Sequence, residues 1–292
     1  MHKREIKKNY YNIYDKIISF WKIYRKNKIA VVGLIIVICF IILALSAPIV
    51  APYDPFKINL IDRHIPPSKV HIMGTDEFGR DVFSRVIWGS KISMAVGFVA
   101  AGISTLLGIT LGSIAGYYGG SIDNIIMRVV DIFMVIPTFF LILIIVAFFG
   151  SNMWNVMVVI GITSWPGTAR IMRAQFLAIR EKEYVEAAKA LGANDFKIIF
   201  NHILPNALYP VIVRASLQVA GAILTESSLS FLGLGDPSKI SWGIMLNRAL
   251  QYMRKSWWQT IFPGISIFLI VFSFNVIGDG LNDALNPRLR ER

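Results

Sequence analysis

The side chains that most often carry catalysis or bind metals are scattered in this sequence. The histidines lack the spacing of metal ligands, and they are His2, His64, His71 and His202. No glycine is followed by lysine, which excludes the GxxxxGK[ST] loop that holds the phosphates of ATP. The single cysteine, Cys39, excludes a disulfide framework. We therefore expect no catalytic residue, no metal site and no cofactor in this chain, and any ATP must be hydrolysed elsewhere.

The one segment whose residue types suggest an interaction is Glu183 to Asn206, a water-compatible stretch between hydrophobic segments. Strong helix formers from Ile179 to Leu191 predict a short amphipathic helix. Its apolar stripe would hold Tyr184, Ala187, Ala188 and Leu191. This segment therefore reads as a docking element and not as a membrane span.

A turn and a second helix are expected to follow. Gly192 permits the chain to turn at a helix end, and Asn194 or Asp195 can cap the helix Phe196 to Leu204. Pro205 is expected to end that helix. The predicted unit is helix, turn, helix.

The spacing of this unit resembles the EAA loop in permease subunits of ABC importers. Glu186, Ala187 and Ala188 are followed by Gly192 and then by Leu204 and Pro205. The resemblance implies a knuckle that enters a groove on an ATPase and transmits its closure to the membrane helices. The residues implied in this coupling are Tyr184, Glu186, Ala187, Ala188, Ala190, Gly192, Ala193, His202, Leu204, Pro205 and Asn206.

Other segments narrow the resemblance to the dipeptide, oligopeptide and nickel permease branch, C-type subunit. They are Met73 to Gly97, Glu226 to Leu246 and Asn275 to Arg290. In the first of them, six residues are expected to build a rigid, charge-paired start to the second span, with Asp81 as a cap: Gly74, Asp76, Gly79, Arg80, Asp81 and Arg85. Two departures concern the subtype: His202 stands where the general pattern is aliphatic, and Asn282 and Asn286 stand where relatives often have a charge pair.

The composition indicates an integral membrane protein. Hydrophobic residues make up 55% and charged residues 16% of the chain, and its mean hydropathy is +0.57. A membrane helix needs about 20 apolar residues. Six stretches are predicted to span the membrane: Ile29 to Val50, Ile92 to Tyr117, Ile132 to Phe149, Met153 to Ile171, Ala207 to Leu229, and Thr260 to Ile277. Their glycines are expected to permit close helix contacts. The expected fold is all-α, and the resemblance implies that of a type I ABC importer permease.

Charge predicts the orientation. Basic residues dominate before Ile29 and at the end of the chain, so the positive-inside rule places both termini and the EAA segment in the cytoplasm. The predicted divisions are a basic and aromatic segment at 1–28, the first span with its external loop at 29–91, a core membrane domain at 92–281 with the coupling loop at about 172–206, and a tail at 282–292. Membrane orientation explains the net charge of +12, so we expect membrane lipid and no nucleic acid as a partner.

Ionisable residues inside membrane spans are expensive and often functional. Of the candidates here, only Arg214 and Glu226 are singled out for a test of a role on a translocation path. A structural ion pair or an interfacial position is the alternative for each of them.

Together these features predict half of the pore of an ATP-driven importer for di- or oligopeptides, in the cytoplasmic membrane of a bacterium or archaeon. The resemblance implies a second permease subunit, one or two ATPase subunits and an external substrate-binding protein. A permease for nickel or a metal chelate is the alternative within the branch. An ion-coupled secondary transporter is the alternative of another class, although buried carboxylates or inverted repeats are not evident.

Overall fold

The computed structural model describes residues 18–285. Residues 1–17 of the predicted basic segment lie outside the described residues, as do Asn286 and the C-terminal arginines. Helices dominate the described part, which contains no β-strand. They are α2 (Lys28–Val50), α3 (Val82–Tyr118), α4 (Gly120–Val135), α5 (Thr138–Phe149), α6 (Met153–Ser164), α7 (Pro166–Arg180), α8 (Glu183–Ala190), α9 (Asp195–Lys197), α10 (Leu204–Phe231), α11 (Trp242–Ala249) and α12 (Trp258–Leu285), with short 3-10 turns at Leu60–Asp62 and Leu250–Tyr252.

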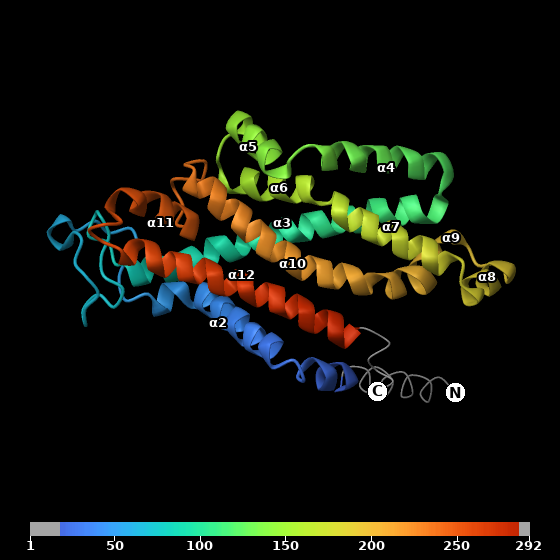
Figure 1. The fold of residues 1–292 in the computed structure, drawn as a ribbon, viewed down its shortest axis with the longest axis horizontal. Helices are drawn as coiled ribbons and strands as arrows, with labels where there is room; N and C mark the ends of the chain where they lie inside the picture. Colours follow the sequence, from blue (N-terminus) through green and yellow to red (C-terminus); the bar gives the residue numbers. More distant parts are fainter. Residues whose placement is uncertain (1–17, 286–292) are drawn as a thin grey trace.

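The long helices α2, α3, α10 and α12 lie side by side in a bundle, with α2 along one edge of the molecule (Figure 1). One end of this bundle carries the loop 51–81 and α11, and the opposite end carries α8 and α9. Asn27, just before α2, donates a hydrogen bond to Asp283 near the end of α12, over 3.3 Å. The start of α2 and the end of α12 therefore lie together, and Tyr184 of α8 lines a cavity with Asn282 and Leu285 of α12.

Four helical runs are long and apolar enough to cross a membrane: Lys28–Val50, Val82–Tyr118, Asp195–Phe231 and Trp258–Leu285. They correspond to four of the six predicted spans, and a fifth is gained if α4 and α5 count as one span. That predicted span, Ile132 to Phe149, is not straight, because α4 and α5 meet at 86°. Pro137 separates the two helices.

The predicted span Met153 to Ile171 is also divided. It falls on α6 and α7, which are separated at Trp165. Pro166 begins α7, where its missing N–H group is not needed. The six-span count is therefore not confirmed.

Glycines bring α3 and α7 into close contact. A Cβ atom at Gly108 would lie 2.5 Å from Cβ of Thr168, and one at Gly112 would lie 2.5 Å from the carbonyl oxygen of Ala169. This confirms the predicted role of these two glycines. For Gly102 and Gly221 the prediction is wrong, because a Cβ atom at either position would meet open space.

The loop before α3 is held by buried charge, as the sequence predicted. Asp76 accepts hydrogen bonds from Nε and the backbone N–H of Arg80, over 2.7 and 2.9 Å, and its carboxylate lies 3.5 Å from Nε of Arg85. These three side chains are almost fully buried. Burial and the neighbouring Asp76 raise the pKa of Glu77 above its usual value. Asp81 caps α3 by accepting from the N–H of Ser84.

Candidate functional site

The candidate docking element begins where the chain breaks after α7. A single helix from Ile179 to Leu191 was predicted, but α7 ends at Arg180 and α8 begins at Glu183. The break turns the chain so that Val185 packs into a buried apolar cluster with Phe176 and Ile203. A straight continuation of α7 would carry Val185 away from that cluster, so burial of Val185 gives a reason for the break.

Most of α8 faces outward. Val185 is its only buried residue, whereas Glu186, Ala187 and Ala190 are exposed and Ala188 is half-buried. The predicted apolar stripe does not face the protein, because Tyr184 is 48% exposed and Leu191 is 88% exposed. Exposed apolar side chains of this kind make the stripe a candidate for contact with another molecule.

The turn after α8 has the predicted form. Gly192 adopts φ +79°, a conformation that favours glycine, and nothing lies near the place of its missing side chain. Asn194 caps the next helix by accepting from the N–H of Lys197 over 2.9 Å. Asp195 instead accepts a 2.7 Å hydrogen bond from the hydroxyl of Tyr117, which ties the turn to the end of α3.

Pro205 does not end the second helix, which corrects the sequence prediction. The helix continues through a π-helical turn, Ile198–Ile203, into α10. The N–H of Leu204 bonds to the carbonyl of Ile199, five residues back. This wider turn, placed immediately before Pro205, accommodates a ring that would clash with the carbonyl four residues earlier in a regular α-helix. The turn at Gly192 is therefore followed by one helical run, Asp195–Phe231, that includes α10.

The remaining residues of the predicted coupling set lie in the buried cluster, in the π-helical turn or beside α12. Ala193 and Leu204 pack against the buried cluster that holds Val185. His202 lies in the π-helical turn, and its carbonyl accepts from the side chain of Asn206 over 2.8 Å. Asn206 and Tyr184 also line a 430 Å³ cavity beside α12.

Two aromatic residues that the sequence analysis did not single out enlarge the exposed surface. Phe196 is 69% exposed and Phe200 is 48% exposed, and their ring centroids lie 4.4 Å apart. Their spacing of four residues on a helix was the available signal, since such pairs share a face. We call these two residues, together with the exposed Tyr184 and Leu191, the docking face.

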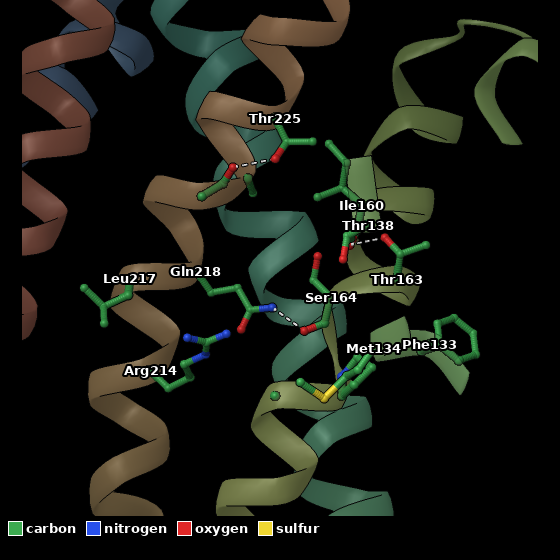
Figure 2. Close-up of a pocket in the computed structure, with 14 residues that line it drawn as sticks. Phe133, Met134, Thr138, Ile160, Thr163, Ser164, Arg214, Leu217, Gln218 and Thr225 are labelled. Carbon is green, nitrogen blue, oxygen red and sulfur yellow. Dashed lines mark hydrogen bonds between the residues drawn. The ribbon is translucent and has the colours of Figure 1, made fainter. Parts of the chain in front are cut away.

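The two ionisable residues of α10 have different surroundings. Arg214 lines a 370 Å³ cavity together with Gln218 and Thr225 (Figure 2). Glu226 is 1% exposed and does not line that cavity. Its carboxylate accepts a 2.7 Å hydrogen bond from the hydroxyl of Ser230, one turn later on α10. The structure thus brings only Arg214 to an open space.

Comparisons with known proteins agree with this architecture. Residues 108–291 match the family of binding-protein-dependent transport system inner membrane components. Residues 18–67 match the N-terminal membrane domain of oligopeptide transport permease C. In solved structures, the fold resembles an inward-facing form of the MetNI methionine ABC transporter, with a TM-score of 0.56 and 19% identity over 69% of this chain and 96% of that chain.

Curated relatives match almost the whole chain. The dipeptide transport system permease protein DppC of Alkalihalophilus pseudofirmus is 44% identical over 91% of this chain and 88% of the relative. DppC of Bacillus subtilis is 42% identical over 92% of this chain and 85% of the relative, and the oligopeptide permease protein OppC of that organism is 40% identical over 96% and 93%. This chain therefore belongs to the family of binding-protein-dependent transport system inner membrane components.

Proposed function

We propose that this chain is a transmembrane subunit of an ATP-driven ABC importer and forms half of its pore for di- or oligopeptides. The observation that carries the proposal is the identity of 40–44% with dipeptide and oligopeptide permease subunits over at least nine-tenths of the chain. Peptides are favoured over nickel because these three relatives are dipeptide and oligopeptide permeases.

The docking face and the turn at Gly192 contact the ATPase subunits. The support is exposure: Leu191, Phe196 and Phe200 are apolar, and between 48% and 88% of each is exposed in this chain. The base beneath them is apolar and buried, because Val185, Ile198 and Ile203 are fully enclosed. A rigid base with an exposed apolar tip suits an element that is pushed by a partner.

Coupling then follows the helix. When the ATPases close on ATP, the docking faces of two permease subunits approach each other. Because the π-helical turn and α10 form one helical run, Asp195–Phe231, the displacement of the tip tilts α10. Residues of α10 line the 370 Å³ cavity, so tilting α10 changes the shape of that cavity. The partner subunits hydrolyse ATP, and this chain contributes half of the translocation path.

The chain lies in the cytoplasmic membrane with six spans, and its termini and docking face are cytoplasmic. The support is that α8 and the described ends of the chain share one end of the bundle (Figure 1), together with the excess of basic residues before α2. The loop 51–81 and α11 then face outward, where a substrate-binding protein delivers the peptide.

Purification in mild detergent from the native membrane tests this function. We expect a second permease subunit and ATPases with phosphate-binding loops to remain bound, and the complex to take up peptide in liposomes when ATP and the binding protein are supplied. Recovery of this chain alone, even after crosslinking in intact cells, would contradict the proposal.

A further inference from the structure

The 370 Å³ cavity beside α10 has a polar wall (Figure 2). Arg214, Gln218, Gly221 and Thr225 line it at intervals of four, three and four residues, so they share one helix face. The run that contains them is apolar enough to span a membrane. A face with arginine and glutamine is too costly to expose to lipid, so it borders water or protein.

Gln218 builds the wall, and both protons of its side-chain amide are already used within this chain. Its Nε2 donates to the carbonyl of Ser164 over 3.0 Å and also to the hydroxyl of Ser104. Its Oε1 accepts from the hydroxyl of Thr168 over 3.2 Å. These bonds fix α10 to α3 and to the junction between α6 and α7.

Arg214 lies one helical turn closer to the docking face than Gln218 does. Its guanidinium has no counter-charge among the described residues. Among residues 18–285, no carboxylate lies within 4 Å of its guanidinium, and no hydrogen bond forms to it. A Cβ atom at position 167 would lie 3.0 Å from Nη2, so Gly167 leaves room for the guanidinium. A planar group with five donors is suited to binding a carboxylate in bidentate fashion.

Hydroxyl groups stand further along the cavity. Thr163 and Thr225 each donate to a carbonyl of their own helix, over 2.8 Å in both cases. Their hydroxyl protons are used, so their oxygen atoms can only accept hydrogen bonds from a ligand. The cavity therefore has a cation near one end and acceptors away from it.

A free peptide has the complementary pattern. Near pH 7 its C-terminal carboxylate is ionised and its amino group is largely protonated. An extended chain covers about 3.3–3.6 Å per residue, and the α10 backbone rises about 16 Å over the eleven residues from Arg214 to Thr225 at 1.5 Å each. A peptide of four or five residues matches that length, and shorter ones reach part of it.

We propose that Arg214 binds the C-terminal carboxylate of the peptide in transit, so that the C-terminus points toward the docking face. This inference rests on the proposed function as a peptide permease. The same guanidinium would also fit a carboxylate of the second permease subunit, and the experiment separates these two sources.

The test uses the complete transporter in liposomes with its binding protein and ATP. Uptake of a short peptide with a free C-terminus is compared with uptake of the same peptide as its C-terminal amide. For each peptide, the rate of the Arg214→Gln transporter is divided by that of the unaltered transporter, which cancels any preference of the binding protein. Arg128→Gln is the matched control, since Arg128 is exposed on α4 and does not line the cavity.

We expect Arg214→Gln to lower uptake of the free acid by about 10-fold or more, the size expected for a charge-assisted hydrogen bond, and to change uptake of the amide by less than about 2-fold. Arg128→Gln should affect both peptides alike. Equal loss for both peptides with Arg214→Gln would assign the guanidinium to the second subunit and overturn the proposal, as would no loss for either. Uptake by the unaltered transporter tests the proposed function separately.

A second variant tests the cavity without touching the charge. Gly221→Leu would fill part of the cavity, because its side chain meets open space. We expect it to reduce uptake of both peptides, more for longer ones, while the complex assembles normally. Gly264→Leu on α12 is the control, since Gly264 also faces open space but does not line this cavity. Unchanged uptake with Gly221→Leu would exclude the cavity from the path.

Discussion

The two ends of the helical bundle carry loops that are held in different ways. The loop before α3 rests on buried charge, since Asp76, Arg80 and Arg85 are between 2% and 8% exposed and both arginines pair with Asp76. The turn at the opposite end rests on buried apolar side chains, among them Val185 and Ile203. Each base supports an exposed apolar tip, with Ile61 at 93% and Leu191 at 88% exposure.

The two kinds of base are expected to respond differently when a partner displaces the loop that they support. A buried ionic base is sensitive to the loss of one partner, because the remaining charge is left unpaired in a poor solvent. An apolar base is more tolerant, and the helix that leaves it continues into α10. The ionic end is suited to remain fixed, and the apolar end is suited to transmit displacement.

The largest expected effect on stability comes from breaking the ionic base. Asp76→Ala leaves Arg85 buried without a carboxylate of the described residues within 4 Å and leaves Arg80 with Glu77 alone. Removal of one partner of a buried pair costs about 3–5 kcal/mol. We expect a strong loss of thermal stability in detergent, or failure to accumulate in the membrane. The control is Asp54→Ala in the same loop, where the carboxylate accepts one exposed hydrogen bond. Equal stability of the two variants would mean that the ionic base does not hold the loop.

A smaller effect on stability, with a large effect on transport, is expected from the turn. Gly192→Val forces a β-branched residue into φ +79°, a conformation that costs L-residues about 1–2 kcal/mol. The variant should insert and assemble its spans, whereas ATPase coupling and peptide uptake should be lost. Normal uptake would remove Gly192 from the coupling path.

Reversing one charge on α8 should leave stability almost unchanged. Glu186 is exposed, so Glu186→Lys is expected to shift the free energy of unfolding by no more than about 0.5 kcal/mol. Uptake should nevertheless be abolished if this face meets the ATPase. Glu183→Lys is the matched control, being the same change on the same helix outside the predicted coupling set, and it should retain more uptake. Full uptake by Glu186→Lys would argue against docking through α8.

The smallest effect on transport is expected from breaking the hydrogen bond that links the turn to α3. Tyr117→Phe removes the hydroxyl that donates to Asp195. A hydrogen bond to a charged group is worth about 1.5–3 kcal/mol, and less is expected here because Asp195 is exposed. We expect full assembly and a partial fall in uptake per ATP hydrolysed. An unchanged ratio would show that the helical run alone carries the coupling.

The sequence predictions are confirmed at positions where a single residue determines the local conformation. The cap at Asp81, the cap at Asn194 and the turn at Gly192 each follow from a side chain or its absence, and the structure confirms all three. The apolar runs in α2, α3, α10 and α12 were also evident, because hydropathy depends on composition alone.

The predictions that were wrong concern places where residues distant in sequence determine the local conformation. Pro205 has the residue type of a helix end, but a π-helical turn before it keeps the helix intact. The break after Arg180 depends on Val185 reaching a cluster that includes Phe176 and Ile198. Gly221 was expected at a helix contact and lies instead at a cavity, since spacing on one helix does not show what stands opposite.

Site-specific crosslinking tests the central claim, that the turn at Gly192 docks the ATPase. In a chain whose Cys39 is replaced by alanine, Leu191→Cys and Ile61→Cys place one reactive thiol at each tip of the bundle. In the purified complex we predict crosslinks from position 191 to an ATPase subunit and none from position 61 to it. Crosslinks to the ATPase from position 61 and not from 191 would contradict both the docking face and the orientation of the chain.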